Sequence, residues 1–304
     1  GRLLPMPRIV AIGEAMLELS GAGTEDLWRM GVAGDTLNTA WYLREALPPA
    51  WQIDYVTRLG TDPFSDRIAA FIGGAGLGTA HILRDAARGP GLYAISLVAG
   101  ERSFTYWRGQ SAARHLADDP AALDAALAGA ALAYVSGITL AILTEDRRAV
   151  LLERIAACGV PLAYDPNYRP RLWEDAAAAR RWTEAAARVA AYVLPSADDE
   201  AACFGDAGPA ETAARYGTLG CETVVKAGGA PVHLGSGAVI GDLPRVDPVD
   251  TTGAGDSFNA AYLAARLTGI APDGAVRAAH ALACRVVQGP GALVPAGRPP
   301  AAGP

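Results

Sequence analysis

The residues whose chemistry is most informative lie at 250–258, where the string DTTGAGDSF combines two carboxylates with a glycine-rich turn. Residues 253–255 lead into an apolar stretch that predicts a helix over 256–267. Glycine lets backbone N–H groups approach an anion closely, and the dipole of a helix N-terminus favours negative charge there. Asp256, in the first turn, could accept the proton of an attacking hydroxyl while the amides hold a transferring phosphoryl group. In a plain glycine turn the same residue would only cap the helix.

The whole string resembles DTTGAGDxF, the C-terminal signature of the PfkB/ribokinase family of small-molecule kinases. The similarity extends from Ile12-Gly13-Glu14 to Gly291. The resemblance implies a doubly wound, mainly parallel α/β sheet flanked by helices, with a small β-sheet lid. It also implies that Asp256 is the catalytic base and that the anion hole consists of the amides of Gly253, Ala254 and Gly255. No GxxxxGK[ST] motif is present, which excludes a P-loop kinase, and no GxGxxG follows the first predicted strand, which argues against a Rossmann dehydrogenase.

A second motif, Gly34-Asp35-Thr36-Leu37-Asn38, stands directly before a predicted helix. On residue type alone, Asp35 would serve as the N-cap of that helix. The family resemblance implies that this pair of residues also contacts substrate hydroxyls, so Gly34, Asp35 and Asn38 are predicted substrate-binding residues.

Two further segments, 101–108 (ERSFTYWR) and 165–173 (DPNYRPRLW), resemble the 2-keto-3-deoxygluconate kinases within the family. That substrate carries a carboxylate, which a planar guanidinium binds through two parallel charge-assisted hydrogen bonds. Arg108 and Arg169 are the candidates for this contact, with Tyr93 and Tyr106 supplying hydroxyls and ring faces. The alternatives are a solvated lid charge for Arg108 and an ion pair with a neighbour such as Asp165 for Arg169.

The predicted nucleotide contacts follow the ends of predicted strands and come from the resemblance. Lys226, the only lysine in the sequence, could steer phosphates or form a surface salt bridge. His280 could lie near the adenine through its position in the last helix, or could simply be packed there. The full set of predicted ATP-binding residues is Asn167, Arg169, Ser196, Lys226, Gly228, Gly229, Gly253, Ala254, Gly255 and His280.

Two kinds of cation are expected. Mg²⁺ is expected because ATP chemistry needs charge neutralisation on the phosphates. Many family members carry an NxxE motif for this ion, but here the stretch 195–200 reads PSADDE; Ser196 and Asp199 fit the spacing, and Glu200 is an alternative. The family resemblance also implies a monovalent cation such as K⁺, with Asp250, Thr252 and the loop 287–292 as candidate ligands.

Short apolar runs alternate with alanine-rich amphipathic stretches along the chain, which favours a mainly parallel sheet covered by helices on both faces. Segments 15–32 and 93–112 break this alternation and are predicted to form the lid. The prediction is one domain over 8–294, followed by a disordered tail over 295–304. The strands are predicted at 8–12, 53–58, 131–135, 161–164, 191–194 and 223–225. The helices are predicted at 36–46, 65–73, 120–127, 144–157, 175–189, 209–216, 256–267 and 272–287.

Composition excludes several classes of protein. With 51% hydrophobic and 19% charged residues among 304, the chain is not intrinsically disordered. A formal net charge of −6 argues against nucleic acid or an anionic membrane as the main partner. Four widely spaced cysteines indicate neither a disulfide framework nor a zinc site. The uncharged stretch 125–144 is predicted to be a helix end, a buried strand and a turn at Ser136–Gly137, not a membrane span. A soluble cytoplasmic protein is expected.

The resulting hypothesis is an ATP-dependent kinase that phosphorylates the C6 hydroxyl of 2-keto-3-deoxygluconate, as a step of the Entner–Doudoroff pathway. Three alternatives stay open: a fructokinase-like PfkB kinase for another sugar, a sugar-acid-binding regulator without turnover, and, least favoured, a dehydrogenase. Open edges of a lid sheet would invite pairing with a second subunit, so a homodimer or a higher homo-oligomer is expected.

Overall fold

The computed structural model describes residues 5–296, and its centre is a sheet of short, apolar, buried strands. In β1, the residues Ile9, Val10, Ala11 and Ile12 are all completely buried, as expected of a parallel strand that is covered on both faces. The strands of this sheet are β1 (Arg8–Ile12), β4 (Gln52–Val56), β9 (Leu132–Ser136), β10 (Leu162–Asp165), β11 (Ala190–Val193), β12 (Glu222–Val225), β13 (Val232–Leu234) and β14 (Val239–Ile240).

Across residues 5–296 the order of the strands in this sheet is β14-β13-β12-β11-β10-β9-β1-β4. All pairs from β12 to β4 are parallel, whereas β13 and β14 extend the sheet as antiparallel strands. The chain starts at β1, adds β4 on one side, and then crosses to β9 on the other side. Ligands in doubly wound sheets bind at the carboxyl edge near such a reversal. The structure therefore confirms the predicted fold class.

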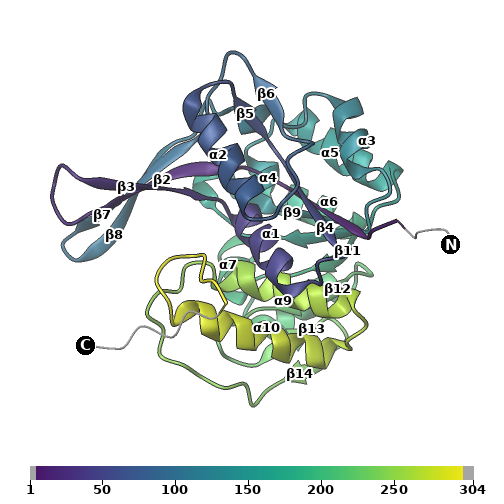
Figure 1. Cartoon of the computed structure of the whole chain (residues 1–304). Coiled ribbons are helices and arrows are strands. Elements are labelled where there is room, and N and C mark those ends of the chain that lie inside the picture. The colour runs from purple at the N-terminus through teal and green to yellow at the C-terminus, as the bar shows by residue number, and fades with distance from the viewer. Residues whose placement is uncertain (1–4, 297–304) are drawn as a thin grey trace.

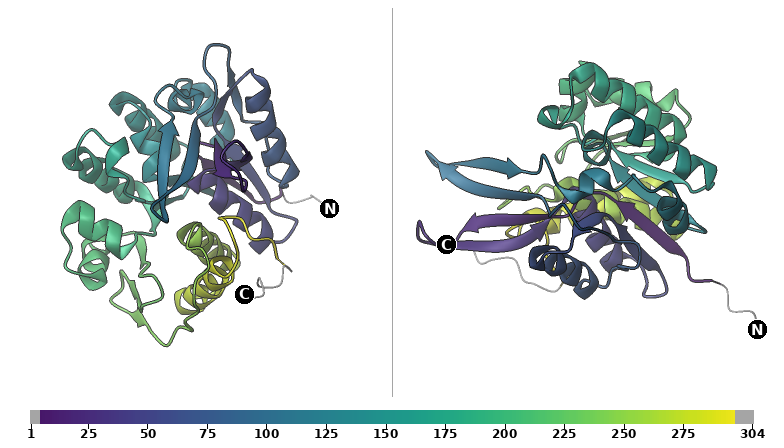
Figure 2. Two further views of the ribbon diagram at one scale, coloured as in Figure 1. Left: turned by 90° about the vertical axis from the view of Figure 1, so that its left-hand side faces the viewer. Right: turned by 90° about the horizontal axis from the view of Figure 1, so that it is seen from above.

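Helices cover both faces of this sheet (Figures 1 and 2). Because side chains alternate along a strand, Ile9 and Ala11 enter one hydrophobic core with α1, α2, α9 and α10, whereas Val10 and Ile12 enter a second core with α3 to α8. The helices are α1 (Asp35–Ala46), α2 (Pro63–Gly74), α3 (Pro120–Leu127), α4 (Gly137–Ala141), α5 (Glu145–Ala157), α6 (Ala176–Val189), α7 (Ala197–Phe204), α8 (Pro209–Gly217), α9 (Ala254–Leu267) and α10 (Pro272–Val287), with the 3₁₀ turns η1 (Ala112–His115) and η2 (Pro170–Leu172).

A second, smaller sheet projects from the body (Figure 1). It comprises β2 (Met16–Gly21), β3 (Trp28–Ala33), β7 (Leu92–Val98) and β8 (Glu101–Trp107) in the order β3-β2-β7-β8. The outer pairs are antiparallel, and β2 pairs with β7 in parallel. We call this sheet the lid. A short parallel pair, β5 (Arg58–Gly60) and β6 (Leu83–Asp85), lies apart from it.

The structure differs from the sequence prediction at several places. The last lid strand ends at Trp107, so 108–112 do not belong to the lid sheet, because Arg108 is buried and η1 begins at Ala112. The turn predicted at Ser136–Gly137 is wrong: Ser136 and Thr139 form a capping box that starts α4. Helix α7 and the strands β5, β6, β13 and β14 were not predicted. Of the predicted disordered tail, 297–304 lies outside the described residues.

No helix within residues 5–296 is long and apolar enough to cross a membrane. The uncharged stretch 125–144 instead supplies the end of α3, all of β9 and the short helix α4.

Candidate active site

Asp256 lies in the first turn of α9, as predicted. The residue before the helix, Gly253, has a φ of 79°, and a Cβ built there would lie 2.7 Å from the carbonyl oxygen of Ala292. Only glycine combines this left-handed backbone with so close an approach. The N–H of Ala254 donates to the carbonyl of Thr251, whereas the amide of Gly255 belongs to the first turn, where a helix provides no internal acceptor.

Two residues of α1 hold Asp256 in place, one through its carboxylate and one through its backbone. The side-chain amide of Asn38 donates to Asp256 Oδ2 at 3.0 Å, and the hydroxyl of Thr39 donates to the Asp256 carbonyl at 3.1 Å. Desolvation and the nearby Asp35 carboxylate raise the pKa of Asp256 to about 8, against the opposing hydrogen bond from Asn38. A carboxylate whose pKa lies near neutrality is suited to act as a general base.

Asp35 and Asn167 meet across the carboxyl edge of the sheet. Gly34 is the N-cap and Asp35 the first residue of α1, so the expectation that Asp35 is the N-cap is wrong. Asn167 Nδ2 donates to Asp35 Oδ2 at 2.9 Å. The backbone of Asn167 has a φ of 33°, and its N–H donates to the side chain of Asp165 at 3.0 Å. A left-handed residue other than glycine is uncommon and often lies at a functional site.

Lys226 is buried beside the start of α9. Its ammonium donates to Asp165 Oδ2 at 2.8 Å and to Asn259 Oδ1 at 3.0 Å. A Cβ built on Gly255 would lie 3.4 Å from Lys226 Nζ. The lysine is only 7% exposed, so the alternative of a surface salt bridge is wrong. Its charge lies next to the predicted anion hole.

Sequence reasoning missed the polar network that surrounds this lysine. Asn259 Nδ2 donates to Asp165 Oδ2 at 2.7 Å and to the hydroxyl of Tyr134 at 2.9 Å. The hydroxyl of Thr39 donates in turn to Tyr134 and to the backbone of Asp256. The only sequence signal was the place of Asp165 at a predicted strand end; for Asn259 and Tyr134, inside a helix and a strand, there was none.

The other predicted nucleotide contacts lie around the ends of β11 and β12. Ser196 pairs with Lys226 in an isolated parallel bridge, and Gly228 and Gly229 follow in a loop where both have positive φ. His280 lies farther along α10, with Nε2 2.5 Å from the Pro244 carbonyl oxygen and 3.2 Å from the sulfur of Cys284. This ring nitrogen is thus engaged by the protein, and contact of His280 with adenine stays a prediction.

Arg108 is not a solvated lid charge. It is 9% exposed, and its Nε and Nη2 donate to Glu14 Oε1 at 2.9 and 2.6 Å. Its guanidinium carbon lies 5.8 Å from the centre of the Tyr106 ring, which stacks on Tyr93 at 5.5 Å. Tyr93 in turn donates a hydrogen bond to Glu18. The two predicted tyrosines and Arg108 therefore form one cluster at the base of the lid.

Arg169, by contrast, is exposed to solvent. Its side chain is 52% exposed, and the nearest carboxylate to Nη1 is that of Asp199, at 3.8 Å, rather than that of Asp165. An arginine so weakly fixed can reorient toward a ligand.

The acidic residues of α7 differ in their surroundings. Glu200 is fully buried and accepts hydrogen bonds from Arg215 and Tyr216, and desolvation raises its pKa to about 7. It belongs to the packing of α7 on α8, so Glu200 does not fit as a magnesium ligand. Asp199 remains partly exposed, as a carboxylate must be to meet a hydrated ion on ATP. Within residues 5–296, no cluster of three acidic, His or Cys side chains forms a complete metal site.

Asp250 and Thr252, the candidate ligands for a monovalent cation, already have protein partners. Arg102 of β8 places Nη1 3.3 Å from both Asp250 Oδ1 and Thr252 Oγ1, and the Gly291 N–H donates to Asp250 Oδ2 at 3.0 Å. Although burial would raise it, hydrogen bonds from Thr252, Arg102 and Gly291 lower the pKa of Asp250 to about 2. These residues form a contact between lid and body that the sequence did not reveal.

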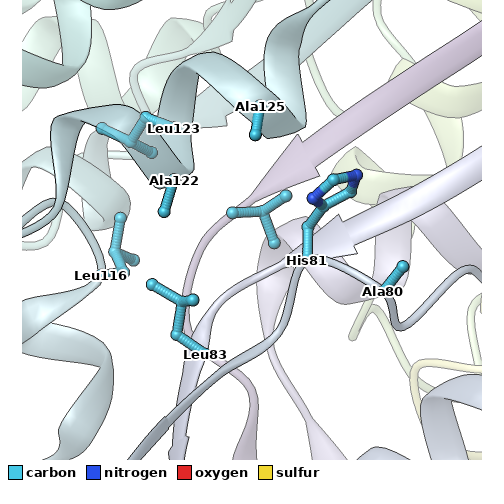
Figure 3. A pocket seen from close by; sticks show the side chains of 8 residues that line it. Ala80, His81, Leu83, Leu116, Ala122, Leu123 and Ala125 are labelled. Carbon is cyan, nitrogen blue, oxygen red and sulfur yellow. The ribbon is translucent and has the colours of Figure 1, made fainter.

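A small apolar cavity of about 130 Å³ lies elsewhere, between β4, β6 and α3 (Figure 3). It is lined by Val56, Ala80, His81, Leu83, Leu116, Ala122, Leu123 and Ala125. None of the predicted site residues lines it, so it does not contribute to the site at Asp256.

A doubly wound sheet with a strand lid, and a helix N-terminus that presents a carboxylate beside a glycine-rich turn and a buried lysine, define a class of α/β kinase without a P-loop. The family model for pfkB family carbohydrate kinases matches residues 6–296. The chain belongs to this family.

The chain is similar to enzymes and structures of the same family. A 2-dehydro-3-deoxygluconokinase of Dickeya dadantii is 40% identical over 301 residues (94% of this chain, 96% of the relative), and one of Escherichia coli K12 is 38% identical over 302 residues (95% and 97%). A PfkB protein of Polaromonas sp. JS666 superposes with a TM-score of 0.80 at 26% identity (93% and 96%). A fructokinase with bound ATP of Xylella fastidiosa gives 0.78 at 22% (95% and 94%).

Proposed function

We propose that this carbohydrate kinase transfers the γ-phosphoryl group of ATP to the C6 hydroxyl of 2-keto-3-deoxygluconate, also called 2-dehydro-3-deoxygluconate. The observation that carries this proposal is the sequence identity of 38–40%, over nearly the whole chain, to kinases named for that substrate. The geometry at Asp256 supports the reaction type, and the arginines near the lid support an acidic substrate.

In this mechanism Asp256 accepts the proton of the C6 hydroxyl, and the oxygen attacks the γ-phosphorus in line with the leaving ADP. Asn38 orients the carboxylate through its hydrogen bond to Oδ2. The amides of Gly253 and Gly255 and the ammonium of Lys226 stabilise the charge that develops on the phosphoryl oxygens. The N–H of Ala254 would have to leave the Thr251 carbonyl to join them. Asp35, fixed by Asn167, is placed to accept a hydrogen bond from a sugar hydroxyl.

Arg108 and Arg169 are proposed to bind the substrate carboxylate, and Tyr93 and Tyr106 to cover the sugar. Asn167, Arg169, Ser196, Gly228, Gly229 and His280 are proposed to lie along the nucleotide. When bound with ATP, Mg²⁺ neutralises phosphate charge. Asp199 is the residue proposed to position it, through water. A monovalent cation at Asp250 and Thr252 remains a prediction that Arg102 would oppose.

Coupled ADP release with MgATP tests the function directly. The panel contains 2-keto-3-deoxygluconate, 2-keto-3-deoxygalactonate, fructose, ribose and adenosine. We expect strong preference for the keto-deoxy acids. Preference for a neutral sugar would retain the kinase mechanism but remove the carboxylate role of Arg108 and Arg169. Absence of turnover with every substrate would favour a binding regulator instead.

Two sets of variants separate the roles within the site. Asp256→Asn should lower kcat by about 10²–10⁴-fold, the usual contribution of a general base, and near-normal turnover would remove Asp256 from that role.

Arg108→Ala and Arg169→Ala should impair turnover of acid sugars more than that of neutral ones. Equal losses for both classes would contradict the carboxylate contact.

We also propose that the protein acts in the cytoplasm as a homodimer or a higher homo-oligomer joined through the lids. Apolar side chains support this, since Leu97 is 75% exposed, Trp107 55% and Trp28 44% on the lid strands. Light scattering should give at least twice the mass of one chain, and Leu97→Glu should lower it.

A further inference from the structure

The lid joins the body at a buried ion pair. Glu14 lies in the short connection from β1 to the first lid strand, β2, and Arg108 directly follows the last lid strand, β8. Nε and Nη2 of Arg108 both donate to Glu14 Oε1, at 2.9 and 2.6 Å. The two side chains are 9% and 1% exposed. Their ion pair therefore ties together the two ends of the lid.

The other connections of the lid are packed around the same carboxylate. Ser111 Oγ donates to Glu14 Oε2 at 2.5 Å, and Arg114 Nε donates to the carbonyl of Arg108 at 2.7 Å. Gly91, immediately before lid strand β7, is so close that a Cβ built on it would lie 2.9 Å from Glu14 Oε2. Both oxygens of Glu14 are thus engaged, and a side chain at 91 would displace them.

The ion pair leaves one edge of the guanidinium available. Among residues 5–296, Nη1 of Arg108 has no hydrogen-bond acceptor, whereas Nε and Nη2 are held by Glu14. A guanidinium can bind one carboxylate on each of two edges. The guanidinium carbon of Arg108 lies 5.8 Å from the centre of the Tyr106 ring. A Cβ built on Gly34, the residue before Asp35, would lie 2.3 Å from the Glu14 carbonyl oxygen. The backbone of Glu14 therefore adjoins the start of α1, while its side chain holds Arg108 beside Tyr106 of the lid.

We propose that Glu14 is a positioning residue for substrate selection: its carboxylate fixes Arg108 so that the Nη1 edge meets an anionic group of the sugar, and the same ion pair stabilises the base of the lid. This inference rests on the proposed function, because it needs an acidic substrate. Glu14 itself does not touch the substrate; it acts through the orientation of Arg108. Substrate selection and lid position thereby depend on one buried carboxylate.

The test compares Glu14→Gln with Asp54→Asn. Glutamine retains the shape of Glu14 without its charge, and Asp54 is a buried carboxylate on β4 that pairs with Arg8 away from the lid. For Glu14→Gln we expect KM for 2-keto-3-deoxygluconate to rise about tenfold, the effect of about 1.4 kcal/mol, with KM for ATP within about twofold. Amide hydrogen exchange should accelerate in β2 and β8. Asp54→Asn should change neither property.

Three results would overturn the proposal: unchanged KM and unchanged exchange in folded Glu14→Gln, a similar rise of KM for ATP, or the same changes in Asp54→Asn. If Glu14→Gln does not fold, Ser111→Ala is the second test, because it removes the hydrogen bond to Glu14 Oε2. This variant should raise KM for 2-keto-3-deoxygluconate by a smaller factor. An unchanged KM in Ser111→Ala would contradict the proposal. If the unaltered protein turns over no sugar acid, the proposed function fails and selection by Glu14 fails with it. Amide hydrogen exchange still decides whether Glu14 stabilises the base of the lid.

Discussion

The guanidinium of Arg102, near the tip of the lid hairpin, faces the carboxylate of Asp250, with Nη1–Oδ1 and Nη2–Oδ2 distances of 3.3 and 3.2 Å. Asp250 opens the loop that leads to Gly253 and α9, so this pair joins the lid to the segment that carries Asp256. Arg102 is 49% exposed. An ion pair this exposed contributes at most about 1 kcal/mol to stability, but we expect it to favour the lid position seen in the structure.

Arg102→Ala should raise KM for both substrates by a few-fold with little change in melting temperature, because the lid then closes less often. In the unaltered protein, salt screens the ion pair between Arg102 and Asp250, so KM should rise in the same way between about 50 and 500 mM salt. In Arg102→Ala, KM should no longer depend on salt. Steady-state kinetics in NaCl and in KCl measure these KM values. Arg29→Ala, which removes another exposed lid arginine, is the control and should behave like the unaltered protein. Equal salt dependence in both variants would contradict the role of Arg102.

The raised pKa of Asp256 predicts how activity depends on pH. A general base acts when it is deprotonated, so kcat/KM should fall as the pH decreases below about 8, with unit slope in the logarithmic plot. Asn38→Ala removes a hydrogen bond that lowers this pKa. The acid limb of the profile, the part where kcat/KM falls at low pH, should therefore move to higher pH. A shift of about one unit corresponds to the loss of a hydrogen bond that contributes about 1.4 kcal/mol.

Thr39→Val is the matched control for this profile. Within Asp256, Thr39 contacts the backbone carbonyl, whereas Asn38 contacts the carboxylate. The valine variant should therefore leave the acid limb in place even if it lowers the rate. An acid limb that does not move in Asn38→Ala would mean that another group controls the profile.

The fold could be predicted from the sequence because local patterns carry it. Buried parallel strands read as apolar runs, as in β1, and Asp119 before Pro120 marks the start of α3, where the Asp119 side chain accepts the Ala122 N–H. Helix α7 was missed because three acidic residues, 198–200, obscure its apolar face. The antiparallel strands β13 and β14 were missed since each has at most three residues.

The candidate site was predictable where a motif names it and not where partners come from distant segments. The position of Asp256 follows from its motif, but the contact between Arg108 and Glu14 joins residues 94 positions apart. Lys226 stood out as the only lysine, yet its burial depends on Asp165 and Asn259, which β10 and α9 bring together. No local pattern encodes such pairings, because they depend on the order of strands in the sheet.

Lys226 is predicted to contribute to phosphate binding separately from its structural ion pair. Lys226→Met should cost about 3–5 kcal/mol of stability, since it leaves the Asp165 carboxylate buried without its partner. The double variant Lys226→Met/Asp165→Asn removes both charges and should recover much of that stability. Denaturant unfolding measures this difference.

The double variant should nevertheless keep a raised KM for ATP and a lowered kcat, because the positive charge beside Gly255 is gone. Asp165→Asn alone is the control, since it retains the ammonium at that place. If the double variant regains both stability and full activity, Lys226 serves only to neutralise Asp165.

The buried carboxylate of Asp256 should also destabilise the folded protein at neutral and alkaline pH. The pKa of Asp256 is about 8 in the folded chain, against an ordinary value of 3.8. Between these two values the folded chain binds a proton that the unfolded chain has lost, so the free energy of unfolding falls as the pH rises through this window. Asp256→Asn removes the ionisable group. Its melting temperature should therefore exceed that of the unaltered protein by a margin that grows from about pH 5 to about pH 8, as measured by circular dichroism. Asp26→Asn, an exposed carboxylate in the turn between β2 and β3, should show no such trend, and a margin independent of pH in Asp256→Asn would contradict the raised pKa.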